Sequence, residues 1–131
     1  MNQIKETFNK AERLCSLKVI EGLFENGSVF YTSLFKVVWG KGNPGQLFPA
    51  QVAFSVPKRS FKLAVTRNLI KRRMREAYRK NKQPLYECLV LSNLNIVFVV
   101  IIKGNTVPDF KAVERSVKEV IDKLISMNRK V

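Results

Sequence analysis

The chain has 131 residues, 46% of them hydrophobic, which is enough for one domain, residues 1–131, with its own core and without stabilising metals or disulfides. Lys and Arg number 24 and Asp and Glu 10, so the formal net charge is +14, and so basic a chain favours polyanionic partners such as nucleic acid. Histidine is absent and cysteine occurs twice. This excludes histidine-based acid–base catalysis and a mononuclear structural zinc site, which needs about four nitrogen or sulfur ligands.

The sequence also indicates where the protein works. Cys15 and Cys88 lie far apart, and we expect reduced packing residues rather than a disulfide, as is typical of the cytoplasm. No signal peptide opens the chain, and the longest apolar run, residues 96–102, is far shorter than the ~20 residues of a membrane-spanning helix. We therefore expect a cytoplasmic protein with no membrane partner.

The first half of the chain predicts one helix and two strands. Residues 1–13 are polar and mixed in charge, and we expect a flexible arm there. Ser16 can cap a helix that stops at Gly27. Its apolar face would hold Leu17, Ile20, Leu23 and Phe24. The β-branched and aromatic residues 29–39 predict a strand, with room for an extra short one, and residues 51–56 predict a second strand antiparallel to the first.

The second half predicts a helix over residues 64–82, a strand over residues 95–103 and a last helix that begins at Asp109. The strand is continuously apolar and β-branched, which suits a strand covered on both faces. The element order α-β-β-α-β-α predicts an α/β (α+β) two-layer sandwich. In it, a small mixed sheet carries helices packed on one face, and the basic helix forms the crossover.

The helix over residues 64–82 separates into two faces at 100° per residue. The apolar face holds Thr66, Ile70, Met74, Ala77 and Tyr78, and the basic face holds Asn68, Lys71, Arg72, Arg75, Arg79 and Lys82. From Lys58 to Lys82 there are 11 Lys or Arg and one acid, Glu76, so this window carries +10. Cations four residues apart repel by roughly 0.2–0.5 kcal/mol per pair, and we interpret the face as a phosphate-backbone surface rather than a merely solvated one.

The run FSVPKR and the following AVTRNLIKRRMREAY closely resemble the signature of the bacterial ribonuclease P protein subunit family. In that family a strand ends in a basic pair, and a short loop leads into an Arg-Asn-Arg-x-Lys-Arg-x-x-Arg helix. The length, the high pI and the order of elements agree along the whole chain, and LCSLKVIEGLFENG is similar to the family's first helix.

The resemblance implies a protein cofactor of a catalytic RNA that removes the 5′ leader from precursor tRNA. The implied partners are ribonuclease P RNA and precursor tRNA, with no DNA expected. Mg²⁺ would be held mainly by the RNA, so no catalytic or metal-binding residue is assigned to this chain. The scattered acids agree with this, since phosphoryl transfer on a protein needs convergent carboxylates.

The resemblance and the charge pattern together place one RNA-binding surface on the basic helix and the loop before it. Its predicted residues are Arg67, Asn68, Lys71, Arg72, Arg75, Arg79, Lys58 and Arg59. Asn68 has an alternative role as a helix cap or loop brace, and Lys58 and Arg59 have one as solvated turn residues. Leu69 stands where the family usually has its second arginine, and Arg73 is a candidate to replace that contact.

The family's second surface is a cleft between the first helix and the sheet, which holds the single-stranded leader. By position in the resemblance Ile20 and Phe24 face this cleft, although Ile20 is as readily a core residue. On the predicted strand we place the leader against Lys36 and Val38, because the charge of Lys36 indicates that its face is the solvent-exposed one. Period-two alternation along residues 29–39 places Lys36 and Val38 on one face and Tyr31 on the other.

Three other functions are compatible with parts of the sequence. A general structured-RNA-binding or ribosomal protein would share the charge and size without a role in cleavage. A helix-turn-helix DNA binder needs a helix just before residues 64–82, where a strand is predicted instead. A protein-only nuclease would need histidine or clustered carboxylates, which the chain does not offer.

Overall fold

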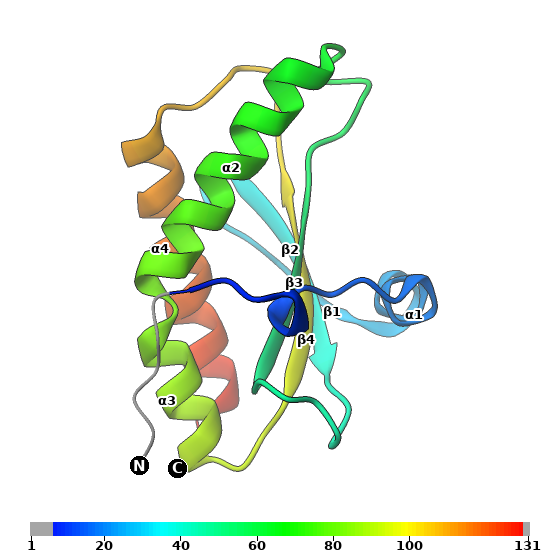
Figure 1. Ribbon diagram of the computed structural model, residues 1–131, viewed down its shortest axis with the longest axis vertical. Helices are drawn as coiled ribbons and strands as arrows, with labels where there is room; N and C mark the ends of the chain where they lie inside the picture. Colours follow the sequence, from blue (N-terminus) through cyan, green and yellow to red (C-terminus); the bar gives the residue numbers. More distant parts are fainter. Residues whose placement is uncertain (1–6, 130–131) are drawn as a thin grey trace.

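The computed structural model describes residues 7–129, which form a four-stranded sheet between two helical layers (Figure 1). Its elements in chain order are the 3₁₀-helix η1 (Lys10–Glu12), α1 (Leu17–Asn26), β1 (Ser28–Tyr31), β2 (Phe35–Lys41), β3 (Ala50–Ser55), α2 (Ala64–Asn81), α3 (Gln83–Leu91), β4 (Ile96–Ile102) and α4 (Phe110–Asn128). The order α-β-β-α-β-α is confirmed in outline. The predicted strand over residues 29–39 divides into β1 and β2, and α3 is an additional helix.

The strand order in the sheet is β1-β2-β4-β3. Strand β2 runs antiparallel to β1 and β4, whereas β3 runs parallel to β4. The predicted antiparallel pairing of residues 51–56 with residues 29–39 is therefore wrong, because β4 lies between those two strands. Strand β4 lies between β2 and β3 and is buried along nearly its whole length. Its continuously apolar sequence suits this position.

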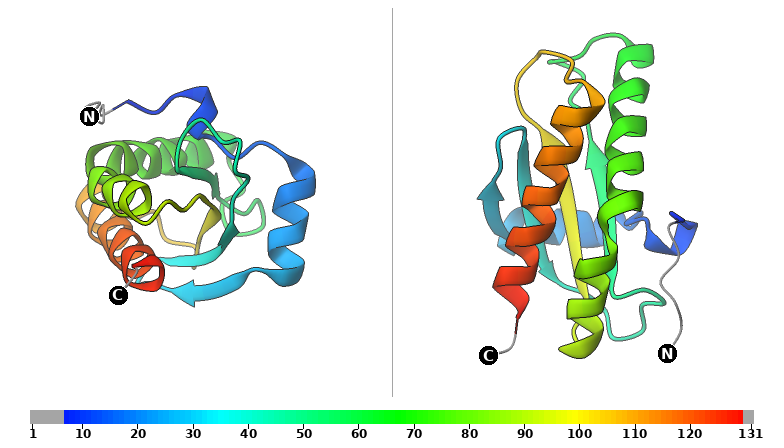
Figure 2. Two further views of the ribbon diagram at one scale, coloured as in Figure 1. Left: turned by 90° about the horizontal axis from the view of Figure 1, so that it is seen from below. Right: turned by 90° about the vertical axis from the view of Figure 1, so that its left-hand side faces the viewer.

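The prediction that all helices pack on one face is also wrong. Helices α2, α3 and α4 cover one face of the sheet, and α1 lies against the opposite face (Figures 1 and 2). Strand β4 explains this, since Phe98 and Val100 belong to the larger core under α2 and α4, while Val97 and Val99 join Leu23 in a smaller core under α1. Two apolar faces require two covering layers.

Helix α1 begins and ends as predicted. The Ser16 side chain accepts a hydrogen bond from the Val19 N–H at 3.3 Å, and Gly27 follows the last residue. A Cβ at Gly27 would lie 2.5 Å from the Leu23 carbonyl oxygen, which explains the glycine there. Of the four apolar residues assigned to the buried face only Leu23 is buried, whereas Leu17 and Phe24 are exposed. The helix therefore touches the sheet along a narrow line.

Residues 1–6 of the predicted flexible arm lie outside the described residues, but residues 7–13 are packed against the fold. The carboxylate of Glu12 is fully buried and accepts hydrogen bonds from the Lys82 ammonium and, at 2.6 Å, from the Tyr86 hydroxyl. Burial raises the pKa of Tyr86 above its ordinary value, so the phenol is the donor in this pair. Lys82 is therefore a buried ion-pair residue and not part of the exposed basic face.

Candidate nucleic-acid interface

Helix α2 has the two faces that its sequence predicts. Its inner residues, Ile70, Met74, Ala77 and Tyr78, are buried in the larger core. Its outer residues are Asn68, Lys71, Arg72, Arg75 and Arg79, all exposed or half-buried. Figure 2 shows α2 beside α4 as a long helix with its outer side uncovered. The apolar residues fix the rotation of the helix, and this rotation turns the cations outward.

Five cations of this surface have no hydrogen-bond or ion-pair partner within residues 7–129. They are Lys58 and Arg59 in the loop before α2, and Lys71, Arg72 and Arg75 on the helix. Nearly every acid in the fold lies elsewhere, so their charge is not neutralised from within the protein. An unpaired guanidinium keeps its five N–H donors for a ligand and matches a phosphate with two parallel hydrogen bonds. We name these five residues the α2 cation surface.

Arg67 is partly used inside the fold. Its Nη1 donates to the carbonyl oxygens of Phe61 and Lys62, both at 2.8 Å. The residue before the helix is Leu63, which supplies no side-chain cap, so Arg67 ties the incoming loop to the first turn of α2. It thereby holds the segment that carries Lys58 and Arg59.

The side chain of Asn68 is exposed and makes no hydrogen bond to any residue in the described part of the chain. It lies in the second turn, beyond the capping position, so the alternative role as a helix cap is wrong. Its amide is open to a ligand on the outer side of α2.

Arg79 differs from the unpaired cations because it contacts the one acid of the helix. Its Nη2 lies 2.5 Å from Oε1 of Glu76, and its Nε donates to the other carboxylate oxygen at 3.1 Å. This hydrogen bond, and secondarily the nearby positive charges, lower the pKa of Glu76 below its ordinary value. The carboxylate therefore stays charged and offsets part of the charge of Arg79.

Arg73, the candidate to replace the arginine that is missing at Leu69, makes a contact inside the fold. Leu69 is half-buried on the flank of α2, and Arg73 lies one turn later on the same flank. The Arg73 Nη1 donates to the carbonyl oxygen of Pro108 at 2.6 Å, just before α4. Arg73 thus ties α2 to the start of α4, and its role as a replacement for the missing arginine stays a prediction.

The second predicted surface is the sheet face beside α1. Phe24 is 53% exposed, Lys36 is half-buried on this face, and Ile20 packs partly against the smaller core. Val38 is 2% exposed and belongs to the smaller core under α1, so it presents no surface to a ligand. The alternation of side chains along the strand predicts Val38 on the cleft face. It does lie on that face, but Leu23 of α1 packs over it.

Sequence reasoning missed a residue on this face. Tyr31 and Lys36 are direct cross-strand partners and lie on one face, although a single strand over residues 29–39 would place them on opposite faces. The chain reverses between β1 and β2, and a reversal resets the period-two alternation. The only signal in the sequence is the Thr-Ser pair at positions 32–33, which favours a turn.

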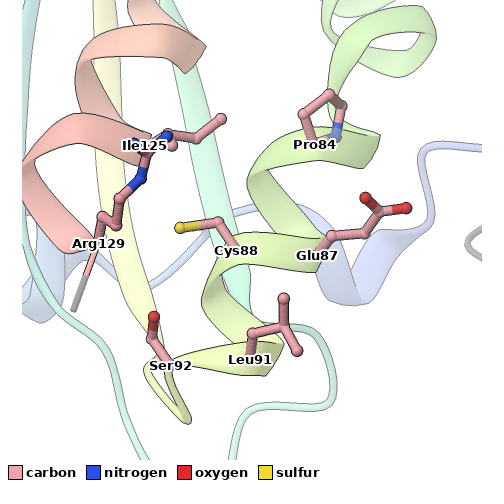
Figure 3. Close-up of a pocket in the computed structure, with 7 residues that line it drawn as sticks. All are labelled: Pro84, Glu87, Cys88, Leu91, Ser92, Ile125 and Arg129. Atoms are coloured by element: carbon pink, nitrogen blue, oxygen red, sulfur yellow. The ribbon is translucent and has the colours of Figure 1, made fainter. Parts of the chain in front are cut away.

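The possible metal ligands are dispersed through residues 7–129. No group of three or more Cys, Asp or Glu there is arranged to hold a metal ion. A pocket between α3 and α4, shown in Figure 3, is lined by Pro84, Glu87, Cys88, Leu91, Ser92, Ile125 and Arg129. It brings one carboxylate and one thiol together with apolar groups, without a base beside the thiol. None of the helices in the described part is both long and apolar enough to cross a membrane.

The fold and the interface define a class of small basic α+β proteins with an outward cation surface on the crossover helix. Comparison with known proteins gives the family. The family model described as Ribonuclease P matches residues 8–125. The ribonuclease P protein component of Porphyromonas gingivalis strain W83 is 32% identical over 111 residues, which is 85% of this chain and 81% of that protein.

Solved structures share the fold. The RNase P protein of Staphylococcus aureus superposes with a TM-score of 0.70 at 20% identity, covering 92% of this chain and all of that chain. The RNase P protein of Thermotoga maritima gives a TM-score of 0.66 at 21% identity, covering 86% of this chain and 96% of that chain. The chain belongs to the bacterial ribonuclease P protein family, and the family resemblance read from its motifs is confirmed.

Proposed function

We propose that this chain is the protein subunit of ribonuclease P and helps the catalytic RNA to remove the 5′ leader from precursor tRNA. In this proposal the α2 cation surface binds the catalytic RNA, and the sheet face beside α1 binds the single-stranded leader. The observation that carries it is the α2 cation surface itself, five cations with no partner in the described fold, in a chain of this family.

The chemistry of cleavage is assigned to the RNA. Hydrolysis of the phosphodiester that leaves a 5′ phosphate needs metal ions to activate water and stabilise the leaving oxygen. We infer that these ions are Mg²⁺ held mainly by the catalytic RNA, since residues 7–129 bring no carboxylates together for that purpose. The protein contributes binding and orientation, which lower the barrier by fixing the substrate near the reacting groups.

The contacts to the catalytic RNA would be of two kinds. Arg72 and Arg75 are suited to fork-shaped contacts with phosphates, and Lys58, Arg59 and Lys71 to less directional ones. Each phosphate neutralised releases a counterion, so assembly should weaken steeply with salt. Arg67 acts by holding the basic loop against the start of α2, as its two carbonyl contacts indicate.

The leader surface would use apolar and cationic groups together. Single-stranded RNA is bound by stacking of bases on aromatic rings and by cations beside the backbone. Phe24 offers an exposed ring on α1, and Lys36 offers a cation on the neighbouring sheet face. Helix α1 is held on the sheet through Leu23, and Lys36 lies in a strand that is paired on both sides.

The experiment is cleavage of a labelled precursor tRNA by a bacterial ribonuclease P RNA at low millimolar Mg²⁺, with and without this protein. The proposal predicts accurate removal of the 5′ leader only when RNA and protein are both present, and no cleavage by the protein alone. If the protein binds the RNA tightly but the RNA stays inactive, the chain is a general structured-RNA-binding protein instead.

A further inference from the structure

We propose that Tyr31, with Lys36 and Lys103, forms a separate platform for one leader nucleotide at the outer edge of the sheet, away from α1. This inference rests on the proposed function, because it extends the leader surface to a strand that the sequence-based prediction did not include.

The register of the sheet defines a path to this platform. Tyr31, Lys36, Ile101 and Ser55 are successive cross-strand partners from β1 through β2 and β4 to β3. They lie on the face that α1 occupies, but one row beyond the buried residues Val38 and Val99 under that helix. At a strand spacing of about 4.8 Å, the row spans roughly 14 Å. It begins at the end of β3, where the chain enters the basic loop, and it ends at Tyr31.

The ring of Tyr31 has the surroundings of a base-stacking site. It is 54% exposed although it stands in a strand, and its hydroxyl has no hydrogen-bond partner among residues 7–129. The Lys103 ammonium lies 5.5 Å from the centroid of the Tyr31 ring, and Lys36 is the cross-strand partner of Tyr31. A ring with one cation above it and another beside it offers a base a stacking surface and its phosphate two charges.

The strand that carries Tyr31 is held rigidly from the opposite side of the sheet. The Lys123 ammonium of α4 donates to the Tyr31 carbonyl oxygen at 2.7 Å. In the turn that follows, the hydroxyls of Thr32 and Ser116 share a buried hydrogen bond of 2.7 Å, and Ser116 also accepts from the Leu34 N–H at 3.1 Å. An edge strand fixed in this way holds the backbone of Tyr31 in place, which lowers the entropy lost when a base stacks on its ring.

The test compares two variants of Tyr31 in the reconstituted holoenzyme. Tyr31→Leu keeps apolar bulk on the strand but removes the ring, and Tyr31→Phe keeps the ring. Affinity is measured for two precursor tRNAs, one with a leader long enough to reach β1 and one with a leader of a single nucleotide. Leu91→Ala, an 82% exposed apolar residue on α3, is the matched control away from the sheet face.

We expect Tyr31→Leu to weaken binding of the long-leader substrate about fivefold to tenfold, and Tyr31→Phe to change it by less than about twofold. The single-nucleotide leader should bind all three proteins equally, and Leu91→Ala should match the wild type with both substrates. Equal loss with both leaders, or no loss with the long one, would overturn the platform. If the wild-type holoenzyme itself did not distinguish the two leaders, the leader-binding part of the proposed function would fail as well.

A second measurement needs no variant. A long leader that carries a photoreactive uridine at successive positions is irradiated on the wild-type holoenzyme, and the crosslinked peptide is identified. The platform predicts a crosslink to residues 28–31 or to Lys103 from a position distal to the cleavage site. Crosslinks to α1 alone, from every leader position, would overturn it.

Discussion

Glu12 and Lys82 stand 70 positions apart in sequence and meet in the interior. The carboxylate also accepts from the Tyr86 hydroxyl and, at 2.6 Å, from the Asn9 N–H. A buried charge is tolerated only when it is paired and hydrogen-bonded. Asn9 lies in the same N-terminal segment as Glu12, whereas Lys82 and Tyr86 lie at the junction of α2 and α3 and in α3. The cluster therefore fastens the N-terminal segment to the junction of α2 and α3.

Removing one charge of this pair should be strongly destabilising. We expect Glu12→Ala to lower the free energy of unfolding by about 3–5 kcal/mol, because Lys82 would stay buried without a counter-charge. Glu76→Ala, which removes a solvent-accessible pair on α2, should change it far less, because solvent screens such a pair. Denaturant unfolding monitored by circular dichroism measures the free energy of unfolding of both variants. Equal losses would contradict the conclusion that the Glu12–Lys82 pair is buried and the Glu76–Arg79 pair is accessible to solvent.

Glu76 supplies a pH-dependent contact on the same helix. Its pKa is lowered in the folded state by the Arg79 hydrogen bond, so the contact stabilises the protein above the ordinary pKa of the free carboxyl. That stability is lost as the pH falls through the lowered pKa. A carbon-detected NMR titration should show Glu76 titrating below the usual glutamate range. In Arg79→Ala its pKa should return toward that range, and an unchanged pKa would show that the contact does not form.

At the scale of elements, α1 is held to the sheet chiefly by Leu23, whose side chain also lies 3.0 Å from the position that a Cβ on Gly40 would take. The exposed Phe24 depends on this attachment. We expect Leu23→Ala to lower the free energy of unfolding by about 2–5 kcal/mol, as for other buried leucines. Affinity of the holoenzyme for the leader should fall with it, while assembly with the catalytic RNA is largely kept. Equal loss of both affinities would show that α1 supports the whole fold.

Helix α2 carries two kinds of outward arginine, and they should differ in salt dependence. Arg72 has no partner among the described residues, whereas Arg79 contacts Glu76. We expect Arg72→Ala to lower the slope of log affinity against log salt for the catalytic RNA by about 0.7–0.9, the value for one phosphate contact. Arg79→Ala is the matched variant and should lower it less, because Glu76 already offsets part of the charge of Arg79. Equal salt slopes for the two variants would contradict the distinction between an unpaired Arg72 and an Arg79 that contacts Glu76.

The whole molecule places the two candidate surfaces on different layers. The α2 cation surface lies in the helical layer, and Phe24 lies across the sheet from it on α1 (Figures 1 and 2). The basic loop that carries Lys58 and Arg59 leads from β3 of the sheet into α2. In the proposed function, this separation would let one chain contact the folded catalytic RNA and the single-stranded leader at the same time.

This separation predicts that the two functions can be lost independently. Arg72→Ala should weaken assembly with the catalytic RNA, and Phe24→Ala should weaken binding of the leader with assembly largely intact. Assembly is measured with the catalytic RNA alone, and leader binding with precursor and mature tRNA on the preassembled holoenzyme. If both variants lost the same function to the same degree, the division into two surfaces would be wrong.

The sequence by itself determined the features that depend on neighbours in the chain. These are the cap of α1 at Ser16, the two faces of α2, the excess of positive charge and the family signature. Helix periodicity and charge are local, because residues three or four positions apart decide which face each side chain takes. For the same reason Arg72 and Arg75 lie on the outer side of α2, where their spacing places them.

Only the tertiary structure decided the features that depend on distant pairing. The insertion of β4 between β2 and β3 overturned the predicted hairpin, and the second apolar face of β4 required α1 on the opposite side of the sheet. Because the chain reverses after Tyr31, this ring lies on the same face of the sheet as Lys36. Val38 lies on that face too, but α1 covers it. Strand order and the burial of a given side chain are set by segments far apart in sequence, and no local pattern specifies them.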